Sequence, residues 1–205
     1  MSVQQAPSQR SAKAAATKAA ILRSARRAFA DHGYEGAGLR GIAREAGVTA
    51  MMVGRYFGSK EALFGEVVAD TMRDPVILSP TNLKAGDLPR ALADALVGVT
   101  TAGSSPLDGF LVLFRSVGSP VAAKIAREQI VAAHHAAATA LMPGDHAGER
   151  AAVLLSLVAG IQMMRQMIEL PALAAADEAV LADILRRLIA TVLSDADRGS
   201  EARVR

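Results

Sequence analysis

Residues 39–57 of this 205-residue chain, LRGIAREAGVTAMMVGRYF, indicate its fold class. The first eight of these residues place apolar side chains at i, i+3, i+4 and i+7, which is the spacing of one face of a short helix at 39–46. Gly47 can take the positive φ of a tight turn, and Thr49 is a good N-cap for a second short helix at 50–57. The stretch therefore predicts two short helices joined by a glycine-centred turn.

A longer, basic helix is expected before this pair, beginning at Thr17 and ending at Gly33, which suits a left-handed C-terminal residue. Its apolar face carries Ile21, Leu22, Ala25, Ala28 and Phe29, and its arginines 23, 26 and 27 lie off that face. A basic helix followed by two short helices around a tight turn has helix-turn-helix geometry. The last helix of such a unit can enter the major groove of DNA.

The rest of the chain also reads as helical. We expect a helix at 60–73, a polar link at 74–89 and further helices at 87–101, 107–117, 120–141, 147–170 and 177–193. No alternating β-branched stretch and no Asn-Gly hairpin occurs, so strands are not needed. The pattern predicts an all-α protein.

Composition narrows the function classes. Hydrophobic residues make up 51% of the chain, enough for a real core, and the absence of cysteine excludes disulfide frameworks and thiolate zinc sites. Residues 1–60 hold ten Lys and Arg against three Asp and Glu, whereas residues 61–205 hold thirteen against seventeen. This asymmetry favours either a polyanionic partner for the N-terminal end or a solvated basic face.

No feature of the sequence directs the chain to a membrane. The N-terminus lacks an apolar signal segment, and the longest nearly uncharged apolar stretch, residues 151–164, is shorter than the ~20 residues of a spanning helix. We therefore expect a cytoplasmic protein without a membrane partner.

The N-terminal motifs resemble those of the tetracycline-repressor-like (TetR/AcrR) family. They are the IL..A...F pattern at 21–29, Gly33-Tyr34, Ile42-Ala43, AGVT at 46–49, Tyr56-Phe57 and GSKEALF at 58–64. Their order and spacing match the family over residues 17–68. The resemblance implies a homodimeric transcriptional regulator, usually a repressor, that binds a double-stranded DNA operator and leaves it when a small molecule binds the body. This chain departs from the family at Ala37 and Gly38, where hydroxyl residues are common, and at Gly54, where tyrosine is common.

With this resemblance, the expected organisation has four parts. Residues 1–16 are a disordered basic tail, 17–60 the helix-turn-helix DNA-binding domain, 61–195 the regulatory and dimerisation domain, and 196–205 a flexible C-terminus. A constitutive DNA-binding dimer without an effector is the first alternative function. An all-helical enzyme or carrier with an incidental basic head is the second.

Eight residues are predicted to contact DNA: Arg40, Thr49, Ala50, Met51, Met52, Arg55, Tyr56 and Lys60. Arg55 can pair with guanine O6 and N7 or with a phosphate. Met51 and Met52 can touch thymine methyls, unless one of them packs inward beside Val53. The Thr49 hydroxyl can both cap the recognition helix and reach a phosphate.

The remaining contacts each have a plainer alternative. In the family the position of Tyr56 often touches the DNA backbone, but a half-buried packing tyrosine is the other interpretation. Lys60 opposes the helix dipole at the start of its helix, which makes sense if a phosphate lies there. A surface lysine without a role is the alternative, and Arg40 is open to the same two interpretations.

The C-terminal helices predict a dimer. The helix at 147–170 is apolar on most sides and that at 177–193 carries a wide apolar stripe, so one chain struggles to cover both. A four-helix bundle with the symmetry mates would cover them. A monomer with an ordinary core is the alternative.

Seven residues are candidates for an effector pocket: Met72, Phe110, Phe114, Gln162, Met163, Gln166 and Met167. Core packing is the alternative for the aromatic and methionine residues, whereas Gln162 and Gln166, together with Arg165, are candidate polar anchors. The adjacent His134 and His135 diverge by ~100° on a helix and cannot chelate one ion together. No nucleotide-binding, GxSxG or HExxH motif occurs, so no cofactor, metal or catalytic residue is expected.

Overall fold

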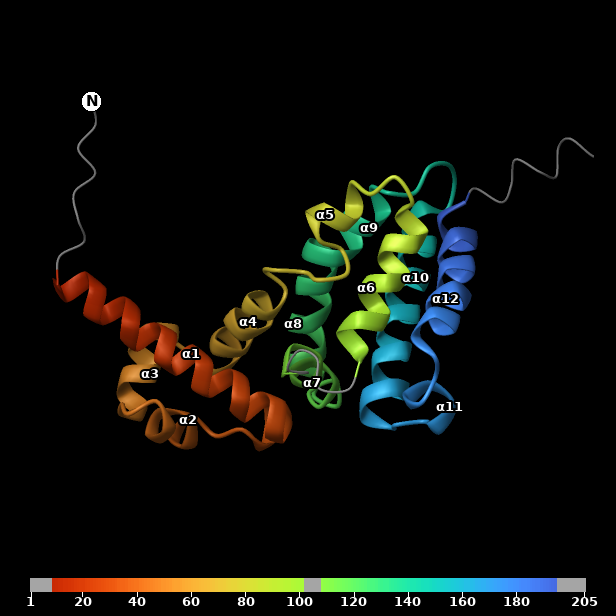
Figure 1. Cartoon of the computed structure of the whole chain (residues 1–205). Coiled ribbons are helices and arrows are strands. Elements are labelled where there is room, and N and C mark those ends of the chain that lie inside the picture. Colours follow the sequence, from red (N-terminus) through yellow and green to blue (C-terminus); the bar gives the residue numbers. More distant parts are fainter. Residues whose placement is uncertain (1–8, 102–107, 195–205) are drawn as a thin grey trace, which may run out of the picture. The chain divides into compact units, whose positions relative to one another are not determined.

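The computed structural model describes residues 9–101 and 108–194 (Figure 1). This part of the chain is helical and contains no strand, which confirms the all-α prediction. The helices are α1 (Gln9–Gly36), α2 (Leu39–Glu45), α3 (Ala50–Phe57), α4 (Lys60–Thr71), α5 (Pro80–Leu83), α6 (Leu88–Thr100), α7 (Asp108–Phe114), α8 (Pro120–Ile130), α9 (Ala136–Thr139), α10 (Ala147–Gln162), α11 (Pro171–Ala174) and α12 (Glu178–Leu193). Two π-helical segments, η1 (Val131–His135) and η2 (Met163–Met167), extend α8 and α10.

The chain divides into two compact units. The first comprises Met1–Met72 and Leu107–Gln129, and the second comprises Arg73–Pro106 and Ile130–Arg205. The helix-turn-helix segment therefore shares a unit with α7 and α8, which follow it in the sequence by more than fifty residues.

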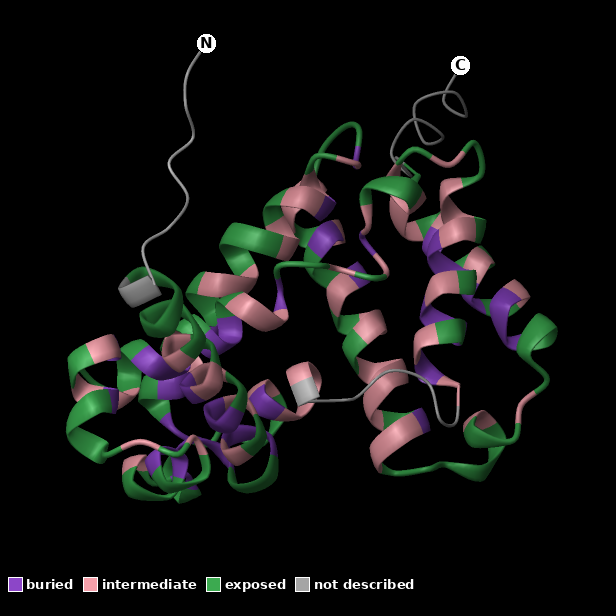
Figure 2. Cartoon of the chain, turned by 60° about the vertical axis from the view of Figure 1, so that its left-hand side comes forward, coloured by how far each residue is buried: buried purple, intermediate pink, exposed green. Residues whose placement is uncertain are grey.

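The first unit is organised around α1. Ile21, Phe29, Leu63 and Phe64 are fully buried there, and Figure 2 shows buried residues where α1 meets the helices around it. The rings of Phe29 and Tyr34 pack with that of Phe64 at centroid distances of 5.1 and 5.2 Å. This cluster attaches α4 to the second half of α1.

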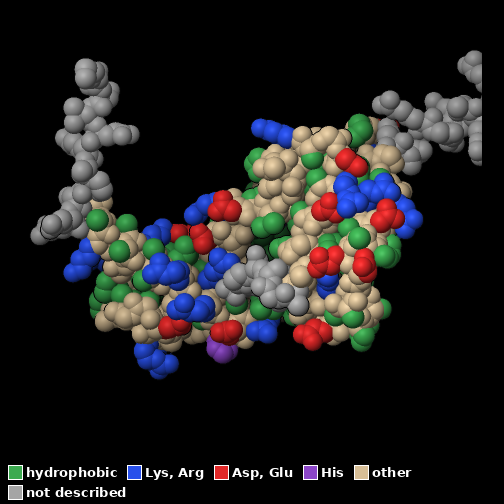
Figure 3. Space-filling model, in the orientation of Figure 1, with side chains coloured by type: hydrophobic (Ala, Val, Ile, Leu, Met, Phe, Trp, Pro, Cys, Tyr) green, Lys and Arg blue, Asp and Glu red, His purple; other side chains and the backbone are tan. Residues whose placement is uncertain are grey.

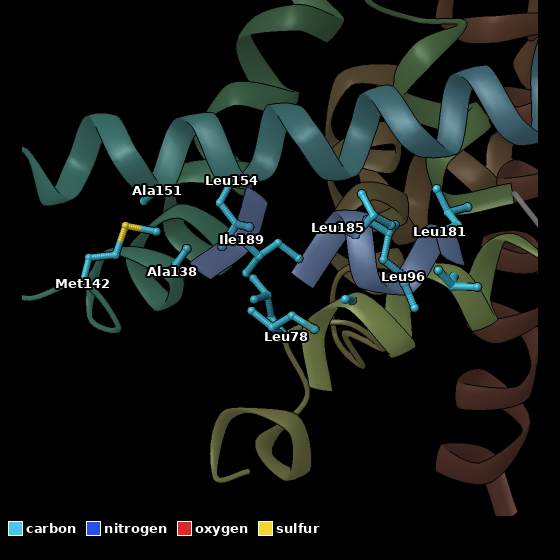
Figure 4. Packing of buried hydrophobic residues seen from close by; sticks show 13 residues of the cluster. Leu78, Leu96, Ala138, Met142, Ala151, Leu154, Leu181, Leu185 and Ile189 are labelled. Atoms are coloured by element: carbon cyan, nitrogen blue, oxygen red, sulfur yellow. The ribbon is translucent and has the colours of Figure 1, made fainter. Parts of the chain in front are cut away.

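The second unit has its own core between α6, α10 and α12. Its buried side chains include Leu92, Leu96, Leu154, Leu185 and Ile189, several of which Figure 4 shows meeting from α6, α10 and α12. Arg150 lies at one end of this core and donates to the backbone oxygens of Val192 at 2.9 Å and Leu193 at 2.6 Å. It thereby supplies partners to the last carbonyls of α12.

Two expectations about α1 need revision. The helix begins at Gln9, so residues 9–16 are helical and not the disordered segment expected there. Alanine, the best helix former, occupies four of these eight positions and extends the helix without a core-facing pattern. Gly33 has the expected positive φ of 66°, but the chain resumes helical turns beyond it as far as Gly36. Residues 1–8 and the expected flexible C-terminus at 196–205 lie outside the described residues.

Candidate nucleic-acid interface

The α2–α3 turn has the geometry that the sequence predicts. Gly47 has φ +68°, and a Cβ added there would meet no atom within 4 Å. Glycine is therefore favoured by the backbone conformation and not by lack of space. The backbone N–H of Val48 donates to Ala43 O at 2.9 Å and closes the turn. Thr49 Oγ1 accepts the N–H of Met52 at 3.3 Å, which confirms the predicted cap of α3.

One face of α3 is buried and the other is exposed. Val53 and Phe57 face the core with 1% and 7% of their surface exposed. Met51 is 85% exposed and Met52 is 36% exposed, so neither methionine packs inward beside Val53. Ala50 and Arg55 are exposed as well, and Tyr56 is half-buried. The outward face of α3 thus presents the types of side chain that contact base edges and phosphates.

Three arginines of this segment are exposed and form no ion pair within the part of the chain that the structure describes. They are Arg40 and Arg44 on α2 and Arg55 on α3. Figure 3 shows Lys and Arg side chains gathered over the unit that contains α1. Free guanidinium groups on an exposed helical face can bind phosphate or guanine without losing an internal partner.

Lys60 has partners within the chain. Its Nζ donates to Glu35 O near the end of α1 at 3.4 Å and lies 4.6 Å from the ring centroid of Tyr34. A cation at the C-terminal end of α1 is favoured by the dipole of that helix, and Glu61 supplies an acidic group in the first turn of α4. The unusual cation at the start of α4 therefore has an intramolecular explanation, and its contact with phosphate stays a prediction.

Tyr34 belongs to this junction between α1 and α4. Its side chain is 5% exposed, and burial raises its pKa from 10.0 to about 12, with a hydrogen bond to Glu61 as the second cause. The phenol is therefore neutral at physiological pH.

A hydrogen-bonded brace that the sequence did not reveal fixes α2 on α1. Ser24 Oγ donates to Ile42 O at 2.9 Å and contacts the Glu45 carboxylate at 3.1 Å, which also accepts Arg27 Nε at 2.6 Å. The bond from Arg27, with a smaller contribution from Ser24, lowers the pKa of Glu45. The available signal was a serine on the apolar face of α1, where a buried hydroxyl needs a hydrogen-bond partner.

The end of α1 is held by the segment after α7. Arg115 Nη1 donates to Ala30 O at 2.7 Å and to Asp31 O at 3.1 Å, and Ser116 Oγ accepts the N–H of Tyr34 at 3.0 Å. A Cβ at Gly33 would lie 2.3 Å from Arg115 O. Backbone contacts at this distance require glycine, so the two segments fit closely.

The predicted effector-pocket residues fall in different units. Met72 is buried in the first unit, where the rings of Phe110 and Phe114 stack with centroids 5.8 Å apart. The other four, Gln162, Met163, Gln166 and Met167, lie at the end of α10 and in η2 of the second unit. That they line one pocket stays a prediction.

Arg165 is a structural residue of the second unit. It is buried, and its guanidinium donates to Val97 O at 2.9 Å, Thr100 Oγ1 at 2.8 Å and Leu173 O at 3.2 Å. Gln166 Nε2 donates to Val99 O at 3.1 Å. Among the described residues, no group of three or more His, Cys, Asp or Glu side chains is arranged to hold a metal ion.

A capped, partly cationic helix-turn-helix on an all-α chain defines a DNA-binding regulator. A family model for bacterial regulatory proteins of the tetR family matches residues 21–67, and one for the tetracyclin repressor-like C-terminal domain matches residues 87–193. The chain belongs to the TetR family of bacterial transcriptional regulators, which bind DNA and are not enzymes.

Relatives are similar over different lengths. The HTH-type transcriptional repressor AcnR of Corynebacterium efficiens is 48% identical over 44 residues, which are 22% of this chain and 23% of AcnR. The match thus spans less than a quarter of that repressor. A TetR-family regulator from Streptomyces coelicolor A3 shares the fold with a TM-score of 0.62 at 23% identity, covering 94% of this chain and all of that one. The multidrug binding protein EbrR complexed with ethidium shares it with a TM-score of 0.66 at 17% identity, covering 87% and 99%.

Proposed function

We propose that this regulator is a homodimeric, cytoplasmic repressor that binds a palindromic operator and is released by a small molecule. The exposed face of α3, with Ala50, Met51 and Arg55 outward on a helix capped by Thr49, carries the DNA-binding part of the proposal. Met52, Tyr56, Arg40 and Lys60 are the remaining proposed contacts. The likeness of the N-terminal part to the repressor AcnR supports the sign of regulation.

The dimer is supported by apolar side chains that one chain leaves exposed. They include Val153 on α10 and Ile168 directly after η2, at 55% and 60% exposure. On α12 they include Val180, Ile184 and Leu188, at 58%, 42% and 48%. At 100° per residue the three α12 positions fall on one stripe, so a second copy can bury them together.

The same apolar surface has a second interpretation. Ala147–Met167 is long and apolar enough, by length and composition, to cross a membrane, and is thus longer than the stretch at 151–164 that the sequence indicated. Arg165 within it is buried on carbonyl groups of the second unit, and Ala151 and Leu154 pack in the core of that unit. These contacts favour a helix that is partly core and partly dimer surface.

The effector is supported by the fold. EbrR, which shares this fold, holds ethidium, so the architecture admits a small molecule. A ligand that binds the DNA-incompetent arrangement more tightly would release the operator.

One observation favours a constitutive DNA-binding dimer as the second candidate. Two of the polar groups considered as effector anchors, Arg165 and Gln166, already donate to groups of their own unit. A thermal-shift screen with chemically diverse small molecules distinguishes the two candidates. A raised unfolding temperature together with loss of DNA binding supports the effector, and the absence of both across the collection supports the constitutive dimer.

Selection from random duplex DNA by the full-length protein tests the main proposal. We expect an enriched palindrome whose half-sites lie about one helical turn, ~34–36 Å, apart, with affinity that falls as salt rises. Enrichment of no sequence, or binding that does not depend on salt, would contradict it. Lys124→Ala is the control, because Lys124 is exposed on α8 and lies outside the helix-turn-helix and the α12 stripe.

A further inference from the structure

Two methionines lie next to each other on the outward face of α3. Met51 is 85% exposed and Met52 is 36% exposed, although methionine is among the residue types that proteins most often bury. Val53 and Phe57 form the buried face of the same helix. The side chain of Met51 therefore does not contribute to the packing of the first unit.

Met51 is the most exposed of the methionines that the structure describes. Met72 and Met142 are each 7% exposed, and Met164, the most exposed described methionine outside α3, is 37% exposed. An oxidant in solution reaches a methionine sulfur more readily when the side chain is exposed. We therefore expect Met51 to be oxidised before the other described methionines.

The chain contains no cysteine, so no thiol competes with the methionines for an oxidant and no disulfide can form. With hydrogen peroxide, the sulfur lone pair of Met51 attacks one peroxide oxygen and the O–O bond breaks. The other oxygen leaves as hydroxide and takes up the proton of the transferred oxygen, which yields one sulfoxide and one water. The thioether is oxidised by two electrons, and the peroxide is reduced by two.

A sulfoxide at Met51 would change the chemistry of the outward face of α3. It replaces an apolar thioether by a polar group with a hydrogen-bond acceptor oxygen. In the major groove the apolar partner of a methionine is the C5-methyl group of thymine. A sulfoxide oxygen beside that methyl group loses its water and gains no hydrogen bond, so the contact becomes unfavourable.

The fold of α3 does not depend on the thioether of Met51. The helix is capped by Thr49 Oγ1, which accepts the backbone N–H of Met52 at 3.3 Å. Val53, which is 1% exposed, attaches the helix to the core. Because the reacting sulfur belongs to an exposed side chain, we expect oxidation to alter the surface of α3 without unfolding it.

We propose that Met51, with Met52 beside it, is a reversible oxidation site through which peroxides weaken the binding of DNA. This inference rests on the proposed DNA-binding function and adds a regulation of the same site that requires no effector pocket. Methionine sulfoxide is returned to methionine by two methionine sulfoxide reductases, one for each epimer, so the modification can be reversed.

Treatment of the full-length protein with hydrogen peroxide tests the proposal. Mass spectrometry follows the sulfoxide at each methionine, and fluorescence anisotropy measures the affinity for one selected duplex before and after treatment. We expect Met51 to be oxidised first and the affinity to fall about tenfold, with an unchanged thermal unfolding temperature. Incubation with both reductases should restore the affinity.

Two leucine variants assign the effect to α3. Met51→Leu combined with Met52→Leu removes both thioethers and keeps apolar side chains of similar volume. We expect its affinity after treatment to equal its own affinity before treatment. Met164→Leu is the matched control, because Met164 is as exposed as Met52 but lies in η2, and it should show the same loss as the wild type.

The outcomes separate the oxidation site from the proposed function. Unchanged duplex affinity in a protein oxidised at Met51, or a loss that persists in the double leucine variant, overturns the oxidation site and leaves the regulator intact. Oxidation of the buried Met72 or Met142 before Met51 overturns it as well. An untreated protein without salt-dependent duplex binding contradicts the proposed function, and this is seen before any oxidant is added.

Discussion

Arg55 and Lys60 are cations five residues apart, and the structure gives them different surroundings. Arg55 is exposed on the outward face of α3, whereas Lys60 is half-buried against Tyr34 and Glu35. A side chain without an internal partner is available for sequence recognition. One that is already bound gives up those contacts before it reaches a phosphate.

Arg55→Ala should relax the sequence preference of the protein. A bidentate arginine–guanine contact contributes ~1–3 kcal/mol of discrimination, so affinity should fall most for the preferred duplex and least for unrelated DNA. Fluorescence anisotropy with matched and single-base-changed duplexes measures this. An equal loss on all duplexes would assign Arg55 to the DNA backbone.

Lys60→Ala should weaken binding at every sequence and lower the salt slope by about one, because one phosphate contact is removed. Salt titration of the same duplex measures the slope, and chemical unfolding measures the loss of the contact with Tyr34. Reduced stability with an unchanged slope would leave Lys60 as a purely intramolecular residue.

Tyr34 predicts a loss of stability at alkaline pH. Its pKa is about 12 in the folded chain against 10.0 ordinarily, so its contribution is complete below pH 10 and disappears as pH rises from 10 to 12. Tyr34→Phe should therefore lose less stability than the wild type between pH 10 and 12, measured by urea unfolding. Tyr56→Phe, which changes the other tyrosine of the chain, is the control. Parallel profiles for wild type and Tyr34→Phe would refute the prediction.

At the scale of the elements, glycines of the same unit have opposite roles. Gly33 has φ +66°, and a Cβ added there would lie 2.3 Å from Arg115 O. Gly54 lies within α3, and a Cβ added there would meet no neighbouring atom within 4 Å. The first is required by a close approach of two segments. The second only lowers the helix propensity of α3.

Alanine substitutions at these glycines should change stability in opposite directions. Gly33→Ala should reduce the free energy of unfolding by ~1–3 kcal/mol through strain and displacement of the segment at Arg115. Gly54→Ala should raise it by up to ~1 kcal/mol, because glycine disfavours a helix interior. Urea denaturation measures both. A Gly33→Ala variant as stable as the wild type would show that the segment at Arg115 can move away from Gly33 without loss of stability.

The elements also show what the sequence could and could not predict. The bounds of α3 were predicted correctly because a capping threonine precedes it and a glycine follows it. The two π-helical segments and the four-residue helices α5 and α11 are too short or irregular to give a periodic signal. The hydrogen bonds from Arg115 to Ala30 O and Asp31 O could not be predicted from the sequence, because any residue type can supply a backbone oxygen. In the candidate interface, exposure of Met51 and Met52 needed the structure, because periodicity alone left one of them open to packing.

At the scale of the whole molecule, the exposed apolar stripe on α12 departs from an ordinary monomer surface. Ile184 and Leu188 lie on it beside Val180, and Ala179 lies off it by about 100°. Substitutions at Ile184 and Ala179 can therefore test separately the apolar stripe and the neighbouring face of α12.

Ile184→Glu should dissociate the proposed dimer, because a carboxylate would be buried in an apolar interface. Ala179→Glu adds the same charge off the stripe and should leave the dimer intact. Light scattering coupled to size-exclusion chromatography measures the mass of each. Dimers of equal stability in both variants would place the interface elsewhere.

The first unit is built from two separate segments of the chain, and this affects the design of an isolated DNA-binding fragment. A fragment that stops at Met72 would lack Arg115 and Ser116, and the carbonyls of Ala30 and Asp31 would lose their guanidinium. In such a fragment the C-terminal end of α1 would be left without these contacts. A fragment that is meant to fold should therefore also contain residues 108–129, joined to residue 72 by a linker.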